Sequence, residues 1–249
     1  MSRPRTSASK KPLLISAGVA LAAVTLGLLS WQASAPSEDE VHGAYVPAPR
    51  ASGAGGAAES EADAALAQLR GLARRQAADK QAVGRPDAPV VLIEYADYKC
   101  GYCGKFARDT EPDLVEKYVA NGTLRIEWRN FPIFGSESEA AARAAWAAGQ
   151  QDRFRQFHGA AYAEGAKAKG FGPDRLRALA KEARVPDLDR FEEDMDGQAA
   201  KDAVARDQEE GYRIGVSSTP SFLVNGRPIA GAQPADAFVD AIEKAKALG

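Results

Sequence analysis

The only two cysteines of this 249-residue chain lie in the segment Cys100-Gly101-Tyr102-Cys103. They follow the apolar run Val90-Val91-Leu92-Ile93 and open a segment with a helical pattern. Two thiols at this spacing can close a small disulfide ring without rearranging the fold. The first thiol would lie at a helix N-terminus, where the backbone N–H groups and the helix dipole favour the thiolate. The pattern therefore predicts the exchange of two electrons with another pair of thiols.

Two other uses of the cysteines compete with redox chemistry. A purely structural disulfide would stabilise little, because so small a ring removes little chain entropy. A zinc site needs about four ligands, and the chain has no other cysteine and only His42 and His158, which are far apart in the sequence. The position of the motif between a strand and a helix favours the redox interpretation. We expect neither a metal nor a cofactor.

The elements on either side of the motif must position it. Residues Val90 to Tyr95 are predicted to form a buried strand, and a helix is expected from the cysteines to about Ala120. Pro112 lacks a backbone donor and clashes with the preceding turn, so this helix should bend or break near Thr110. Alternation over Leu124–Asn130 predicts a second strand. A helical crossover of this kind suits parallel pairing of the two strands.

The remainder of the chain is predicted to be a helical block followed by a hairpin. Helices are expected over Ser136–Gly149, Gln151–Glu164, Pro173–Val185 and Pro186 to about Tyr212, the last with a possible break near Gly197. Asn225-Gly226 between two short apolar runs predicts a β-hairpin, and Pro234–Leu248 should be a final helix. The fold class is therefore α/β: a central mixed sheet flanked by helices, with an all-helical insertion over about residues 136–215.

The N-terminus has the pattern of a membrane anchor. A basic tail over residues 1–12 precedes an uncharged stretch over residues 13–31. Nineteen helical residues would span roughly 28 Å, close to the ~30 Å hydrocarbon core. Basic residues lie only on the N-terminal side, so the N-terminus should stay cytoplasmic and the rest of the chain outside.

A cleaved signal peptide is the alternative for this segment. Ala33-Ser34-Ala35 fits a cleavage site, but Pro36 should hinder cleavage and the apolar run is long for a signal sequence. Both alternatives export the domain and leave it secreted, periplasmic or membrane-anchored. Export to an oxidising compartment is consistent with a working disulfide.

Residues 32–82 are predicted to be a linker, rich in Ala, Pro, Ser and Gly at first, with a short amphipathic helix over residues 59–80. The folded domain is expected over residues 83–249. About 165 residues are enough for one sizeable core. The net charge of the whole chain is −2. The sequence contains no basic patch that would indicate a nucleic-acid partner.

Three features together resemble the thioredoxin superfamily, and within it the exported DsbA-like disulfide oxidoreductases. They are the run APVVLIEYADYKCGYC ending at Cys103, the inserted helical block, and the run TPSFLVNG over residues 219–226. The resemblance implies a thioredoxin-like fold with a helical insertion. Gly101 and Tyr102 stand where many members have Pro followed by His. The positive charge of that His is therefore missing.

The resemblance also implies roles for individual residues. Cys100 would be the exposed attacking thiol and Cys103 the buried resolving thiol. Pro220 would be cis and face the cysteines, and the backbone of Thr219 would pair with an extended substrate. A trans proline that breaks a loop is the alternative for Pro220.

Neighbouring side chains complete the expected site. Glu94, on the strand six residues before Cys100, would lie buried beneath the site with a raised pKa and accept the proton of Cys103; a solvent-facing strand residue is the alternative. Tyr102 is expected to line the binding surface and Lys99 to add charge or be solvated. Asp97 is expected to cap a turn and His158 to be an ordinary helix residue.

These patterns predict a membrane-tethered, extracytoplasmic thiol–disulfide oxidoreductase that donates the disulfide of Cys100 and Cys103 to exported proteins. The family implies a membrane partner that reoxidises the pair. A reductase or isomerase is the alternative within the same chemistry. A non-catalytic peptide- or protein-binding module is the alternative of another class, and reactivity of the thiols distinguishes it.

Overall fold

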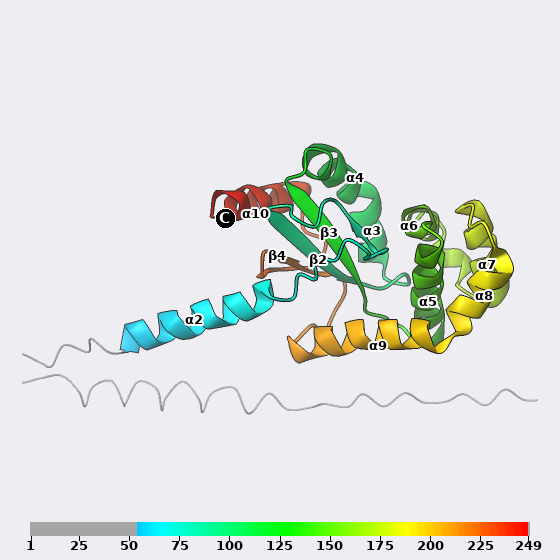
Figure 1. Cartoon of the computed structure of the whole chain (residues 1–249), viewed down its shortest axis with the longest axis horizontal. Coiled ribbons are helices and arrows are strands. Elements are labelled where there is room, and N and C mark those ends of the chain that lie inside the picture. The colour runs from blue at the N-terminus through cyan, green and yellow to red at the C-terminus, as the bar shows by residue number, and fades with distance from the viewer. Residues whose placement is uncertain (1–53, 249) are drawn as a thin grey trace, which may run out of the picture. The chain divides into compact units, whose positions relative to one another are not determined.

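The computed structural model describes residues 54–248 (Figure 1). The expected anchor over residues 13–31 and the first part of the expected linker lie outside these residues. Among the helices of residues 54–248, none has both the length and the apolar character needed to cross a membrane.

A five-stranded mixed sheet forms the centre of the fold, with strand order β1-β3-β2-β4-β5. Its strands are β1 (Ala82–Val83), β2 (Val90–Ala96), β3 (Leu124–Asn130), β4 (Ser221–Val224) and β5 (Arg227–Ala230). β2 pairs in parallel with β3 and antiparallel with β4, and β4 and β5 form the expected hairpin. Asn225 and Gly226 both have positive φ, at 45° and 81°, as a tight two-residue hairpin turn requires. The central position of β2 explains why it is apolar along most of its length.

Helices cover both faces of the sheet (Figure 1). On one face, Val90 and Leu92 pack against Phe106 of α3 (Gly101–Asp109) and Phe238 of α10 (Ala235–Ala247). On the other face, Val91, Ile93 and Tyr95 lie in a separate apolar cluster with residues that flank α2 (Ala54–Arg70) and α9 (Gln198–Arg213). Alternate side chains of β2 thus enter two different cores, which fixes its register against the helices.

The helix that starts at the cysteines breaks where the sequence predicts. α3 ends at Asp109, and Thr110 has φ −122° and ψ −48°, outside the helical range. The chain continues as α4 (Glu111–Leu114) with Pro112 in its first turn, then as a π-helical turn, η1 (Val115–Val119). The break directs Glu111 into the protein interior, where it is 4% exposed.

The helical insertion between β3 and β4 is confirmed. It contains α5 (Ser136–Gln150), α6 (Phe154–Ala161), η2 (Lys167–Lys169), α7 (Pro173–Glu182), α8 (Leu188–Asp196) and α9. Gly197 separates α8 from α9, as expected. The helix predicted over Gln151–Glu164 is shorter, because Asp152 adopts a left-handed conformation with φ 58°. Fully buried alanines of α5, among them Ala141, Ala144 and Ala148, allow neighbouring helices to approach closely.

The segment before the domain differs from the expectation. The helix predicted over residues 59–80 is α2, which begins at Ala54 and ends at Arg70. The next residues form an irregular strap, and the backbone N–H groups of Arg74 and Arg75 donate to the buried carboxylate of Glu127 at 2.9 and 2.7 Å. β1 then spans the expected boundary between linker and domain at residues 82 and 83 and pairs with β3. The folded part of the chain therefore starts before residue 83, because the strap supplies hydrogen-bond donors to the buried carboxylate of Glu127.

Candidate functional site

Both cysteines are free thiols at the start of α3. Cys100 is the residue before the first helical residue, with extended φ and ψ of −77° and 120°. It is 5% exposed, whereas Cys103 is fully buried at 0%. Both cysteines are therefore buried, and Cys100 is the more exposed of the two.

The surroundings of Cys100 favour its thiolate. The hydrogen bond from the Cys103 thiol is the largest influence and lowers the pKa of Cys100 to about 5, in spite of burial. The hydroxyl of Thr219 and the backbone N–H groups of Tyr102 and Cys103 act in the same direction. At neutral pH the reduced protein thus carries an ionised Cys100, the form that attacks disulfides.

The loop before β4 lies against Cys100. The peptide bond between Thr219 and Pro220 is cis. The Sγ atom of Cys100 lies 3.2 Å from the backbone carbonyl oxygen of Thr219, to which the thiol donates a hydrogen bond when it is protonated. Antiparallel pairing of β4 with β2 holds this loop at the end of the sheet from which α3 departs. The structure therefore brings Thr219 and Pro220 to the cysteines, as the resemblance implies.

Cys103 and Glu94 form the buried side of the site. Burial raises the pKa of Cys103 well above its usual range, and the proximity of Cys100 and Glu94 raises it further. Glu94 of β2 is 1% exposed, so the alternative of a solvent-facing side chain is wrong. Burial, followed by the charge of Glu111, raises the pKa of Glu94 well above its usual range. Burial therefore favours the protonated form of the Glu94 carboxyl.

Glu94 has spare hydrogen-bonding capacity. Its Oε1 atom is buried and has no hydrogen-bond partner among residues 54–248. Its carboxyl group lies on the same face of β2 as Val90 and Leu92, the face that α3 covers. A buried carboxyl without a fixed partner can give or take a proton without first breaking a strong interaction.

A second buried acid, Glu111, lies between the sheet and the insertion. The guanidinium of Arg155 pairs with Glu111 Oε1, and His158 Nε2 lies 3.2 Å from Glu111 Oε2. Burial opposes the charge of Glu111, but His158 and Arg155 together hold its pKa at about 2. His158 is a helix residue as expected, yet it is buried and also contacts the Tyr98 hydroxyl at 3.4 Å. The sequence contained no signal for this cluster, because its members come from separate elements.

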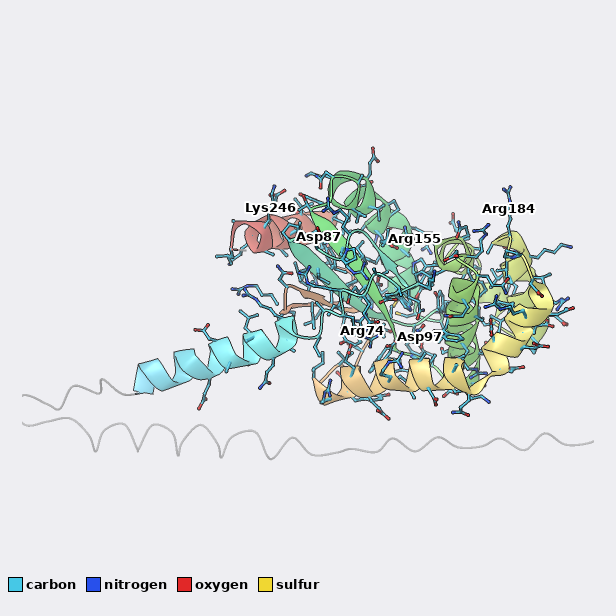
Figure 2. All side chains as sticks on the ribbon, viewed as in Figure 1. Arg74, Asp87, Asp97, Arg155, Arg184 and Lys246 are labelled. Atoms are coloured by element: carbon cyan, nitrogen blue, oxygen red, sulfur yellow. The ribbon has the colours of Figure 1, made fainter. Side chains whose placement is uncertain are left out.

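Asp97 ties the turn before the cysteines to the segment that follows β3. Its carboxylate accepts hydrogen bonds from the backbone of Lys99 at 2.7 Å and from the Ser138 hydroxyl at 2.7 Å. It also accepts from the backbone N–H groups of Ile133 and Phe134. Asp97 lies where the sheet meets the helical block (Figure 2). The expected turn-capping role of Asp97 is confirmed.

A groove of about 720 Å³ lies beside Cys100. Tyr102 and Phe134 line it with exposed fractions of 68% and 50%. Lys99, Gly101, Lys105, Lys167 and Thr219 complete the lining. Tyr102 thus lies where the sequence placed it, whereas Phe134 and Lys167 come from segments that the sequence analysis did not connect with the site. The ammonium of Lys99 lies 3.0 Å from Glu137.

Across residues 54–248, no three His, Cys, Asp or Glu side chains are grouped as metal ligands.

The chain is similar to a known protein family and to a named relative. The family model described as Thioredoxin matches residues 76–244. A probable disulfide bond formation protein D of Bacillus cereus is 31% identical over 153 residues, which cover 59% of this chain and 70% of that protein.

Two solved structures share the fold. Oxidised BdbD from Bacillus subtilis superposes with a TM-score of 0.62 and 25% identity, covering 67% of this chain and 92% of that one. A thioredoxin-like oxidoreductase from Silicibacter pomeroyi DSS-3 superposes with a TM-score of 0.60 and 28% identity, covering 67% and 91% of the two chains. The thioredoxin-like arrangement of mixed sheet and flanking helices is thereby confirmed.

Proposed function

Because the chain belongs to the thioredoxin family, in its DsbA-like branch, and is a thiol–disulfide oxidoreductase, we propose that it works as an oxidase of exported proteins. The observation that carries the direction is the lowered pKa of Cys100, at about 5. A thiolate that is stabilised in the reduced protein shifts the equilibrium of the cysteine pair towards the reduced form. The oxidised pair is then a strong oxidant.

The proposed reaction has two exchange steps. A substrate thiolate attacks Cys100 Sγ of the oxidised enzyme, the Cys100–Cys103 bond breaks, and its electron pair passes to Cys103. The second thiolate of the substrate then attacks the substrate sulfur of the mixed disulfide, and Cys100 leaves as a thiolate. The substrate gains a disulfide, and the enzyme pair accepts two electrons.

Glu94 donates and accepts a proton during these exchange steps. Its protonated carboxyl donates to Cys103 as that sulfur leaves, and it takes the proton back when the pair is reoxidised. The burial of both groups and the influence of Glu94 on the pKa of Cys103 support this role. Thr219 and Pro220 contribute the other wall of the site, where an extended substrate segment pairs with the backbone as an added strand.

The location and the redox partner follow from the same proposal. Residues 13–31 anchor the chain in the cell membrane, and the catalytic domain lies on the extracytoplasmic side. A membrane redox partner takes the two electrons from the reduced pair. The uncharged N-terminal stretch supports this placement. Relatives named as disulfide bond formation proteins support a reaction that belongs in an oxidising compartment.

Trapping of substrates tests the proposed function. In a Cys103→Ala variant, the Cys100 thiolate can still attack a substrate disulfide, the reverse of the donation step, which breaks that bond and frees one substrate thiolate. The variant has no second thiol to release the mixed disulfide from its own side, so substrates should stay linked to Cys100 in intact cells. The double variant Cys100→Ala/Cys103→Ala is the control, because it keeps the surface but lacks the attacking sulfur. Exported proteins captured only by the single variant support the proposal. A well-expressed single variant that captures none contradicts it and favours a binding module.

A redox equilibrium tests the direction. The purified protein is equilibrated with mixtures of reduced and oxidised glutathione, and the fraction of protein disulfide is measured. An oxidase should remain largely reduced in mixtures that fully oxidise thioredoxin-type reductases; each 30 mV or so of potential corresponds to about a tenfold change in this equilibrium. A protein that stays oxidised in strongly reducing mixtures would be assigned the reductase role.

A further inference from the structure

Cys100 lies at the junction of two hollows on the protein surface. One is the groove of about 720 Å³ already described, and the other is a smaller hollow of about 130 Å³ on the opposite side of the first turn of α3. Cys100, Gly101 and Lys167 line both of them. A substrate segment that lies in either hollow is therefore beside Lys167.

Every charged residue that lines either hollow is a cation. The groove has Lys99, Lys105 and Lys167, and the smaller hollow has Arg108 and again Lys167. This local excess contrasts with the net charge of −2 for the whole chain. The surface around the sulfur is thus electrostatically different from the average surface of the protein.

Only one of these four cations has no partner within residues 54–248. Lys99 pairs with Glu137 at 3.0 Å, and Lys105 pairs with Asp109 at 2.7 Å. Arg108 donates to the carbonyl of Tyr162 at 2.7 Å. The ammonium of Lys167 makes neither an ion pair nor a hydrogen bond with these residues, and its side chain is exposed. It is available to pair with a group that a substrate brings.

The fold holds Lys167 close to the motif. Lys167 begins the short helix η2, and its neighbour Ala166 is 2% exposed, which anchors the segment on the insertion. Gly165 and Gly170 flank the segment in left-handed conformations, with φ of 73° and 68°. The Nζ atom lies 3.7 Å from the point where a Cβ on Gly101 would be. The ammonium thus lies over the first turn of α3.

We propose that this cationic surface selects substrate segments with an acidic residue beside the reacting cysteine, and that Lys167 is the residue that recognises the acid. The inference rests on the proposed function, because it assumes that substrate thiolates attack Cys100. In an extended segment, successive residues lie about 3.3 Å apart. A carboxylate one or two residues from the reacting sulfur can therefore meet Lys167. Tyr102 and Phe134 supply apolar contacts for the rest of the segment.

A charge-swap experiment on the full-length protein tests this selection. The probes are two dithiol peptides that are identical except that glutamate or lysine flanks the first cysteine. The rate constant of oxidation by the disulfide form is measured for each peptide with the wild-type protein, Lys167→Gln and Lys167→Glu. Lys169→Gln is the matched control, because Lys169 lies on the same short helix but lines neither hollow. The ratio of the two rate constants, compared between proteins, cancels the intrinsic reactivity of the peptides.

The acidic-to-basic ratio should fall about twofold to fivefold in Lys167→Gln, the range expected for one exposed ion pair, and further in Lys167→Glu. It should stay at the wild-type value in Lys169→Gln. High salt should lower the ratio of the wild-type protein towards that of Lys167→Gln, because exposed charges are screened. An equal ratio in the wild-type protein and both Lys167 variants overturns the inference while leaving the oxidase function intact. A wild-type protein that oxidises neither peptide overturns the proposed function, and the inference with it.

Discussion

The sulfur of Cys100 lies 3.2 Å from the carbonyl oxygen of Thr219, although the two residues are 119 positions apart in the sequence. The contact joins the two halves of the fold that the helical insertion separates. It places the backbone of the loop before β4 beside the one reactive atom of the site. A substrate that pairs with this loop is thereby aligned with the sulfur it attacks.

The reduced protein should be more stable than the oxidised protein, by an amount that depends on pH. The pKa of Cys100 is lowered to about 5 in the folded state, from about 8.5 for an unperturbed thiol. Its stabilising contribution is thus fully present above pH ~8.5 and is lost as the pH falls through about 5. Urea unfolding of both forms between pH 4 and pH 8 measures the difference. A difference that is constant over this range would contradict the lowered pKa.

Replacement of Thr219 by Val should raise the pKa of Cys100 above its value of about 5. The hydroxyl of Thr219 is buried without a partner among the described residues, so it is available to donate to the thiolate. Thr219→Ser keeps the hydroxyl and should leave the pKa close to that of the wild-type protein. Ultraviolet absorbance of the thiolate as a function of pH gives both values. If the pKa of Cys100 were the same in the Val and Ser variants, the low pKa would be due to the helix start and to Cys103 alone.

Glu94→Gln should slow the exchange steps that involve Cys103 while the protein stays folded. The amide keeps the shape of the buried carboxyl but cannot exchange a proton, so the loss should reach up to about 100-fold. Stopped-flow formation of the mixed disulfide from the oxidised protein, the step in which Cys103 leaves, measures the effect. The surface variant Glu116→Gln should react at the wild-type rate. Unchanged kinetics in Glu94→Gln would exclude Glu94 from the mechanism.

Glu127→Gln should destabilise the protein by about 3–5 kcal/mol, the usual cost of breaking a buried ion pair. Glu127 is 0% exposed, and it pairs with Arg125 at 2.8 Å and Arg129 at 2.9 Å. Burial opposes its charge, but the two arginines hold the pKa of Glu127 at about 2. Its contribution is present above pH ~4.3 and is lost as the pH falls through about 2, so the difference between wild type and variant should shrink in acid.

Urea unfolding at neutral and acid pH checks this prediction, with the exposed Glu139→Gln as the control. A loss in Glu127→Gln no larger than that in the control would mean that the strap over residues 71–76 does not depend on the carboxylate.

Two glycine-to-alanine substitutions in helices should have opposite effects. In α9, a Cβ on Gly211 would lie 2.6 Å from a ring carbon of Phe131 and 3.2 Å from Tyr95, so Gly211→Ala should destabilise by about 1–3 kcal/mol. In α6, a Cβ on Gly159 meets nothing within 4 Å, so Gly159→Ala should stabilise by up to about 1 kcal/mol. Thermal unfolding of both variants measures the two changes in stability. Stabilisation by Gly211→Ala would show that α9 can move away from the sheet.

The sequence by itself determined the features that depend on neighbouring residues. The spacing of Cys100 and Cys103, the apolar run of β2, the break at Thr110 and the turn at Asn225-Gly226 each follow from local sterics or periodicity. Their positions in the structure agree with the prediction to within a few residues. The family resemblance supplied the order in which these local elements assemble.

Only the tertiary structure decided which polar groups are buried and what they contact. Alternation in β3 is equally consistent with solvated and with buried charges, and the strap that buries Glu127 has no periodic pattern of its own. The contact of Glu111 with His158 joins residues 47 positions apart, and Lys167 reaches Gly101 from the insertion. Electrostatic interactions of this kind depend on distance and burial, and neither quantity is encoded in local spacing. The sequence therefore specified the reacting atoms, and the fold specified their ionisation and their access to substrate.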